Sequence, residues 1–200
     1  MIRFLNNISS RDIKVVGGKA AALGELINAG INVPNGFVIT TEVSIDNLEN
    51  LQKVIYEAFD KLNCKFAAVR SSATIEDNPK DSFAGQFETY LNITKRDLIA
   101  NIKRCIDSKN SERIKAYCEE KKININKIKM AVIIQKMIDS NVAGVAFTIH
   151  PVSKDKNQIL IEAAYGLGEA VVSGIINPDD YIVDKNSFNI LSTEIREQEK

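Results

Sequence analysis

Apolar positions along this chain recur with two periods, which predict strands and helices that follow one another throughout. Helical spacing predicts a helix that opens after Gly18 and ends before Gly30, further helices at 42–62, 94–106 and 111–122, and a helix start within 166–174. Apolar runs predict strands at 2–5, 37–40, 66–69, 130–137, 142–149, 158–164, 177–183 and 188–191, and residues 1–16 read as a short strand-like lead. The mixture predicts an α+β fold.

The segment 68–91 is the most informative part of the pattern. The apolar run Phe66 to Val69 ends in Arg70, two serines, a threonine and an acidic turn follow, and a second extended run returns after residue 86. Arginine can meet a phosphate with two parallel hydrogen bonds, and hydroxyls and backbone N–H groups supply further donors. A β-hairpin with a polar turn and a surface arginine fits the same residues equally well.

Two further positions carry candidate chemistry. Gly17 and Gly18 precede Lys19 at a helix start, where the backbone can approach a ligand and the helix terminus favours anions. This spacing is not that of a P-loop, and taken alone it favours a solvated lysine. Gln135 interrupts an apolar strand, where an unpaired buried amide would cost about 1–3 kcal/mol. It is either a satisfied core residue or a ligand contact.

Composition narrows the function classes. The 26 basic and 26 acidic side chains cancel, so the chain has no overall field for nucleic acid or an anionic membrane, and any anion site must be local. The three cysteines, Cys64, Cys105 and Cys118, form no C-x-x-C pair and indicate reduced thiols. No signal-peptide core or 18-residue apolar run is present. We therefore expect a cytoplasmic protein that binds neither nucleic acid nor membranes.

Several motifs together resemble the phosphoenolpyruvate synthase (pyruvate, water dikinase) and pyruvate phosphate dikinase family. Residues 68–92 read A-V-R-S-S-A-T-I-E-D-N-P-K-D-S-F-A-G-Q-F-E-T-Y-L-N, which matches nearly every specified position of the family's nucleotide-binding signature. The G-G-K segment at 17–19, the run V-P-N-G-F-V-I-T at 33–40 and G-L-G-E-A-V-V-S-G at 166–174 also match, in the family's order. The resemblance implies an ATP-grasp-like, two-lobed nucleotide-binding domain that uses ATP and Mg²⁺.

The resemblance also implies roles for individual residues. Lys19 and Arg70 would neutralise phosphates, Gly85 through Thr89 would cover them with backbone and hydroxyl donors, and Gln135 would fix the base. It assigns no catalytic residue and no metal ligand to this chain. In the family's reaction, ATP phosphorylates a histidine on another domain, and that histidine passes the phosphate to pyruvate.

The same resemblance implies a division of the chain. A small lobe at roughly 1–92 would carry a shortened helical insertion, and a second lobe at roughly 93–200 would be incomplete at its C-terminus. In the family a later segment with a Glu and a Gln-x-Arg-Pro motif holds magnesium and the triphosphate. We expect the phosphohistidine and phosphoenolpyruvate or pyruvate domains on the same enzyme or on a separate chain. Residues 1–200 could thus be a fragment, a split gene product or a relic.

Two alternatives remain open from the sequence. Rifamycin phosphotransferases use a very similar nucleotide domain with an antibiotic acceptor, and a catalytically inactive binding or interaction module could keep the same fold. His150 is the only histidine, and we expect a structural or surface role, because the family's phosphohistidine lies in a separate domain with a glycine-rich context. Whether this chain is an enzyme by itself is left open.

Overall fold

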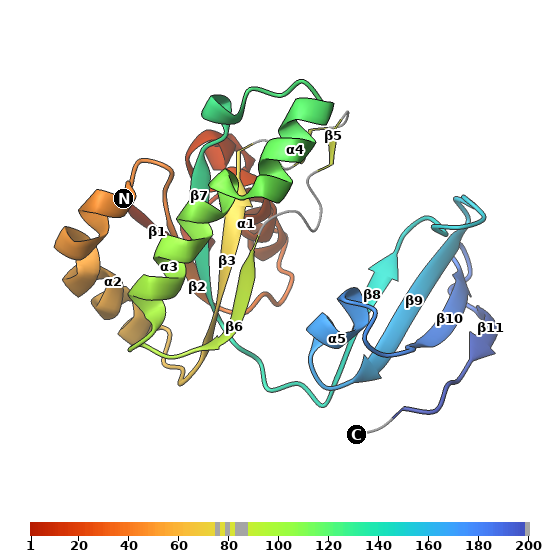
Figure 1. The fold of residues 1–200 in the computed structure, drawn as a ribbon. Coiled ribbons are helices and arrows are strands. Elements are labelled where there is room, and N and C mark those ends of the chain that lie inside the picture. The colour runs from red at the N-terminus through yellow and green to blue at the C-terminus, as the bar shows by residue number, and fades with distance from the viewer. Residues whose placement is uncertain (75–76, 79–80, 83–87, 199–200) are drawn as a thin grey trace. The chain divides into compact units, whose positions relative to one another are not determined.

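The computed structural model describes residues 1–74, 77–78, 81–82 and 88–198, and the chain forms two units (Figure 1). The first unit is Met1–Met137 and the second is Ile138–Lys200. All strand pairs among the described residues are antiparallel, and helices pack on the sheets. The predicted α+β class is confirmed.

The first unit is built on a five-stranded sheet with the strand order β1-β2-β7-β3-β6. Its strands are β1 (Ile2–Phe4), β2 (Gly36–Ile39), β3 (Ala67–Ala73), β6 (Thr89–Ile93) and β7 (Met130–Lys136). A separate two-stranded pair, β4 (Asp77–Asn78) and β5 (Asp81–Ser82), lies in the connection from β3 to β6. The first six residues of β7 are all buried, because β2 and β3 flank this strand and helices cover both of its faces.

Helices cover the two faces of this sheet separately (Figure 1). α2 (Leu48–Lys61) and α3 (Leu98–Asp107) share one apolar core with the sheet, and α1 (Ile13–Asn28) forms a second core on the opposite face. α4 (Glu112–Glu120) contributes to a third cluster at the end of β3. The remaining helical turns are short 3-10 helices at Leu5–Asn7, Ser10–Asp12, Ile45–Asn47, Ser108–Asn110 and Ile125–Lys127.

Two glycines shape α1. Gly17 has φ 77° and ψ 169°, a non-helical conformation that separates the turn at 13–16 from the rest of the helix. The segment 13–16, expected as part of a strand-like lead, is therefore helical. At the other end Gly30 has φ 81°, and the Ile31 N–H donates to the Leu26 carbonyl at 2.9 Å, as in a Schellman motif. The predicted glycine stop is confirmed.

Two helices begin later than their apolar pattern predicted. Residues 45–47 form a 3-10 turn, so α2 begins at Leu48 and not near residue 42. The helix expected from residue 94 begins at Leu98 as α3. The Thr94 hydroxyl donates to the Asp97 carboxylate at 2.6 Å, and Asp97 is the residue that precedes the helix. Polar side chains near a helix start can thus bond to one another and shift the boundary by a few residues.

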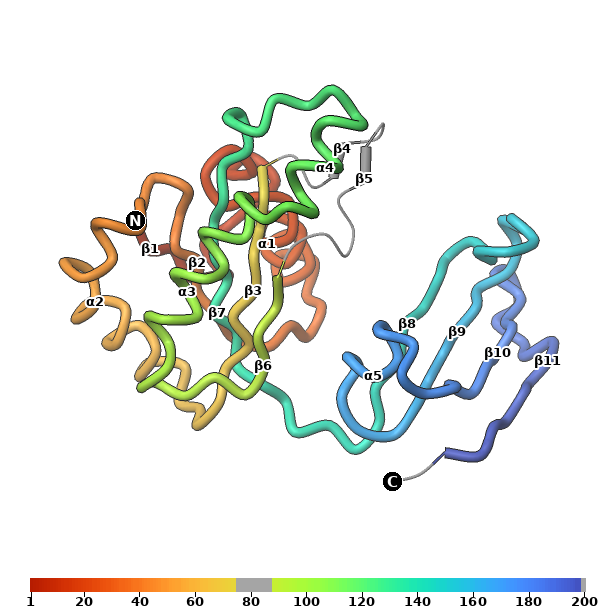
Figure 2. Tube along the Cα trace, in the orientation of Figure 1, coloured from red at the N-terminus to blue at the C-terminus, as the bar shows by residue number. Residues whose placement is uncertain are grey.

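The second unit has its own four-stranded sheet, with the order β11-β10-β9-β8. It comprises β8 (Val142–Phe147), β9 (Gln158–Tyr165), α5 (Gly168–Val172), β10 (Asp179–Asp184) and β11 (Ile190–Glu194), close to the predicted elements (Figure 2). The expected lobe boundary near residue 92 falls within β6, in the sheet of the first unit. That sheet continues to β7, since β7 pairs with β3 along its whole length.

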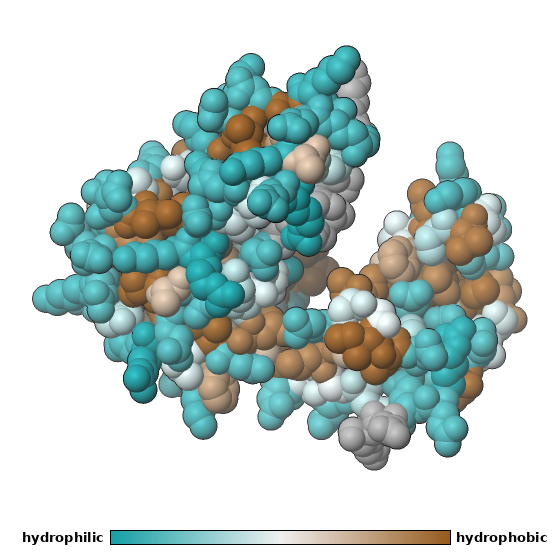
Figure 3. Space-filling view, in the orientation of Figure 1, coloured by the Kyte–Doolittle hydropathy of each residue, from teal (hydrophilic) through white to brown (hydrophobic). Residues whose placement is uncertain are grey.

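The surface of the first unit is largely hydrophilic in the view of Figure 3, with smaller apolar patches between charged side chains. None of the helices among the described residues has both the length and the apolar character needed to cross a membrane.

Candidate functional site

Arg70 lies in the middle of β3. The sequence placed it at the end of its strand, and this prediction is wrong, because β7 supplies partners for β3 as far as Ala73, which faces Met130. The other neighbour, β6, pairs with β3 only up to the partners Arg70 and Thr89. Arg70 is therefore the last residue of β3 that has a strand partner on both sides, and beyond it only β7 pairs with β3.

Three of the predicted residues share one face of the sheet. The partner of Arg70 on β7 is Ile133, which belongs to the core formed with α1, so Arg70 lies on the α1 side. Gln135 is two residues along β7 from Ile133, and alternate residues of a strand share a face. Thr89 is the direct partner of Arg70 on β6 and shares its face as well. Register alone brings Arg70, Thr89 and Gln135 together.

Gln135 contacts Arg70 directly. The Nη1 of Arg70 donates to the Gln135 Oε1 at 3.4 Å, a long contact, and the Gln135 Nε2 donates to the Pro34 carbonyl at 3.1 Å. The Gln135 side chain is 7% exposed, and both ends of its amide have partners. The buried amide is thus satisfied within the protein, and its carbonyl end points to the proposed phosphate-binding arginine.

Lys19 approaches the same strand from α1. It lies in the first turn after Gly17, and its Nζ donates to the Ser71 carbonyl at 3.4 Å. One residue further, the Ala20 N–H donates to the Ser72 hydroxyl at 3.1 Å. The start of the continuous part of α1 is therefore joined to the two residues that follow Arg70, which places the two predicted cations at adjacent points of β3.

Gly17 makes that joint possible. A Cβ built on Gly17 would lie 2.2 Å from the Ser72 carbonyl oxygen and 2.4 Å from its hydroxyl. The two glycines were expected to let the backbone approach a ligand. At Gly17 the space that a side chain would fill is occupied by β3, so this glycine serves the contact between helix and strand.

The motif serines also bond within the protein. Ser71 and Ser72 are fully buried, and the Ser71 hydroxyl donates to the Glu88 carbonyl at 2.8 Å. The sequence suggested such hydroxyls as phosphate donors, and it gave no signal for these partners, because Glu88 lies on the far side of the hairpin connection. The Glu88 carboxylate forms an ion pair with Arg113 at 3.8 Å.

A buried thiol lies on the opposite side of the sheet from Arg70. The Cys105 Sγ is 3.7 Å from the Val69 carbonyl oxygen and fully buried. Burial, and secondarily the negative charge of Glu88, raises the pKa of the Cys105 thiol to about 12. Near neutral pH it stays protonated and is a packing residue, not a nucleophile.

Gly85 lies outside the described residues. Among the residues that are described, no three His, Cys, Asp or Glu side chains gather in a way that could hold a metal ion. The groups that do gather, Lys19, Arg70 and Thr89, are two cations and a hydroxyl, which suit an anion. They offer none of the carboxylate oxygens that Mg²⁺ prefers.

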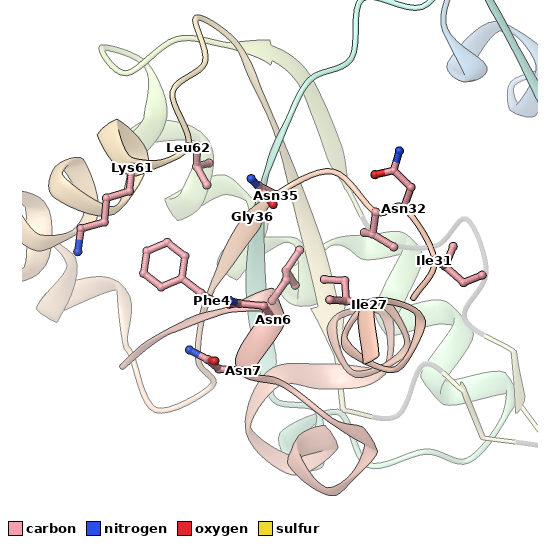
Figure 4. A pocket seen from close by; sticks show the side chains of 12 residues that line it. Phe4, Asn6, Asn7, Ile27, Ile31, Asn32, Asn35, Gly36, Lys61 and Leu62 are labelled. Atoms are coloured by element: carbon pink, nitrogen blue, oxygen red, sulfur yellow. The ribbon is translucent and has the colours of Figure 1, made fainter. Parts of the chain in front are cut away.

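A cavity of about 350 Å³ lies in the first unit, between the 3-10 turn at 5–7, the end of α1 and the segment 31–36 (Figure 4). Asparagine side chains from both segments line it, and the four described site residues are not among its lining residues. It meets the site only indirectly, since Pro34 in the segment 31–36 accepts the bond from Gln135.

His150 belongs to a turn in the second unit. Its Nδ1 lies 3.3 Å from the Val152 N–H nitrogen and 3.4 Å from that of Ser153, and both donate to it. The imidazole therefore stabilises the connection between β8 and β9.

Comparison with known families shows which family this chain belongs to. The model of the family described as "Pyruvate phosphate dikinase, AMP/ATP-binding domain" matches residues 13–65 and 44–200. The chain belongs to this family. Both matched segments include 44–65, which contains α2. The AMP/ATP-binding domain family thus covers both units of the structure.

Three curated relatives of this dikinase-domain chain are named phosphoenolpyruvate synthase or probable phosphoenolpyruvate synthase. A probable phosphoenolpyruvate synthase from Methanothermobacter thermautotrophicus is 37% identical over 98% of this chain and 36% of its own length. A probable phosphoenolpyruvate synthase from Methanocaldococcus jannaschii is 35% identical over 99% of this chain and 21% of its own length. The phosphoenolpyruvate synthase of Pyrococcus furiosus is 31% identical over 99% of this chain and 34% of its own length. The chain spans about a fifth to a third of the length of these relatives.

Proposed function

We propose that this chain is the ATP-binding part of a phosphoenolpyruvate synthase-like phosphotransferase. In that reaction ATP phosphorylates a histidine on another domain, of the same enzyme or of a separate chain, and the phosphate passes to pyruvate. The observation that carries the proposal is the gathering of Lys19, Arg70, Thr89 and Gln135 around one strand of the sheet, in a member of an AMP/ATP-binding domain family.

Each residue has a distinct part in the proposal. The Lys19 ammonium supplies a point charge, and the planar Arg70 guanidinium supplies paired donors that match phosphate oxygens. The Thr89 hydroxyl adds a donor from the neighbouring strand, and Gln135 holds the base. Phosphoryl transfer depends on such positioning and on neutralised phosphate charge. Mg²⁺ would neutralise further phosphate charge when bound.

The finer fold assignment is part of the same proposal. We place the chain in the ATP-grasp-like class, with a small lobe at roughly 1–92, a second lobe at roughly 93–200 and an abbreviated helical insertion. Two observations support the abbreviation. The alignment with the Methanocaldococcus relative extends over 247 positions, although this chain has 200 residues. The two segments matched by the family model also overlap at 44–65, between the segments that contain Lys19 and Arg70, where the longer insertion would lie.

Isothermal titration of ATP–Mg²⁺ against the Arg70→Ala variant tests the proposal. Loss of a charge-assisted pair worth about 1.5–3 kcal/mol should weaken binding by about 10- to 150-fold. Arg96→Ala is the matched control, since Arg96 is an exposed arginine of the same unit, in the turn before α3. Equal affinity of wild type and Arg70→Ala would overturn the assignment.

A further inference from the structure

Ser71 is the residue at which three parts of the proposed site meet. Its N–H and its hydroxyl both donate to the Glu88 carbonyl, at 3.1 Å and 2.8 Å. Its own carbonyl accepts the bond from the Lys19 Nζ at 3.4 Å. Through the chain it adjoins Arg70, and through Glu88 it adjoins Thr89.

The hydroxyl of Ser71 is committed to this contact. The side chain is fully buried, and its only donor points at the Glu88 carbonyl with the short distance of a well-formed bond. Regular pairing of β3 with β6 stops at Arg70 and Thr89, so the hydroxyl extends the attachment beyond the end of the ladder. The Cys105 thiol, at 4.0 Å from the same carbonyl, adds only a weak contact.

We propose that Ser71 is a positioning residue that holds Glu88, and with it Thr89, in register with Arg70 and Lys19. It touches no nucleotide itself. It sets the spacing between two cations that come from α1 and β3 and a hydroxyl that comes from β6. The inference rests on the proposed function, since the spacing matters only if these residues share a phosphate-bearing ligand.

A matched serine separates positioning from ordinary stability. Ser108 is also buried in the first unit, and its hydroxyl donates to the Cys105 carbonyl at 2.7 Å. Ser71→Ala and Ser108→Ala each remove one buried hydroxyl that bonds a backbone carbonyl, so both should lower stability similarly. Only the first should disturb the site.

The test combines titration of ATP–Mg²⁺ with hydrogen exchange of the backbone amides in β6. We expect Ser71→Ala to weaken ATP binding about fivefold, the equivalent of one ordinary hydrogen bond, and to speed exchange in residues 89–91. Ser108→Ala should change neither. Ser71→Thr, which keeps the hydroxyl, should restore binding to within about twofold of wild type.

Three results would overturn the inference. They are unchanged ATP affinity in Ser71→Ala, equal weakening in Ser108→Ala, and unchanged exchange in β6. Failure of the proposed function has a different signature, because wild type itself would then not bind ATP–Mg²⁺. The exchange measurement uses no nucleotide, so it still decides whether the Ser71 hydroxyl holds β6.

Discussion

Arg70 and Gln135 show how two long polar side chains can occupy a buried sheet. Gln135 spans the distance between the Pro34 carbonyl and the Arg70 guanidinium, so one amide serves a donor and an acceptor at once. A guanidinium carries five N–H donors in a planar fork, a geometry that matches the oxygens of a multiply charged anion. Through this contact Arg70, which is proposed to bind phosphate, touches Gln135, which is proposed to hold the base.

The Cys105 thiol predicts how the free energy of unfolding changes with pH. Its pKa is about 12 in the fold, mainly because of burial, against about 9 when exposed. The folded state therefore holds this proton more tightly, so its stabilising effect is complete below pH 9 and is lost as the pH rises toward 12. We expect the free energy of unfolding to fall over this window, by up to about 1.4 kcal/mol per pH unit from this group.

Urea denaturation of wild type and Cys105→Ala between pH 8 and pH 11 would measure this effect. The variant should start less stable but lose stability less steeply with pH. Parallel curves for the two proteins would contradict the assignment of the slope to Cys105. Burial also raises the pKa of Tyr90 and Cys118, so some pH dependence should remain in the variant.

The roles of the four candidate site residues stay a prediction from the sequence, and the partners of the neighbouring serines could not be predicted at all. Lys19, Arg70, Thr89 and Gln135 were singled out by chemistry and resemblance, and register brings three of them to one face. Ser71 and Ser72 looked like ligand donors because small polar residues in a loop often are. Their bonds to Glu88 and Ala20 depend on pairing between distant segments, which no local pattern encodes.

Among the elements, α1 depends most on a single residue. Gly17 combines a backbone conformation close to one that only glycine adopts readily with a Cβ position 2.2 Å from the Ser72 carbonyl oxygen. Gly17→Ala should therefore lower the free energy of unfolding by about 3 kcal/mol or more. Because Lys19 follows directly, the same change should also weaken ATP–Mg²⁺ binding.

Gly30→Ala provides the matched control for this prediction. Gly30 also has a positive φ, at 81°, but a Cβ there would meet nothing within 4 Å. Its substitution should cost only the backbone strain, about 1–2 kcal/mol, and leave nucleotide binding unchanged. Chemical denaturation of both variants gives the comparison, and an equal loss of stability would show that the close approach to Ser72 is unimportant.

Elements were predicted well where their residues determine them locally, and less well at their ends. The glycine stop of α1 and the apolar strand at 130–137 were clear, since each rests on neighbouring residues. The extension of β3 past Arg70 was missed, because Ser71 and Ser72 resemble turn residues. They remain in the strand since β7 offers a partner for each of them.

For the whole molecule, the two units differ in how much apolar surface they bury. Most of the fully buried apolar side chains belong to the first unit, and in the second unit those below a tenth exposure are Leu160, Ala164, Val171 and Val183 among the described residues. The strand β11 is exposed along its whole length. Because apolar burial is the main stabilising term in folding, the second unit should open more readily.

Native-state hydrogen exchange should reveal this difference. We expect amides of β8 to β11 to exchange at least tenfold faster than those of β3 and β7, through openings that leave the first sheet intact. Guanidinium titration followed by exchange gives the free energy of each opening. A single free energy shared by both sheets would contradict the prediction and show that the units unfold together.

The division into units was the least predictable feature. The lobe boundary expected near residue 92 came from the resemblance and stays a prediction. The unit that the structure shows is held by a sheet that joins β3, at 67–73, to β7, at 130–136. Such pairing joins segments about sixty residues apart in the chain, and hydrophobic periodicity carries no information on which distant strands will be neighbours.

The route of the chain out of the first unit has a mechanical consequence. The chain leaves from the end of β7, a strand that pairs with β2 on one side and β3 on the other. Tension on the segment that follows Met137 would act along β7, across hydrogen bonds that lie perpendicular to the pull. Two ladders must then shear at once, so the first sheet should resist extension, and the proposed ATP site beside β7 should keep its geometry under load.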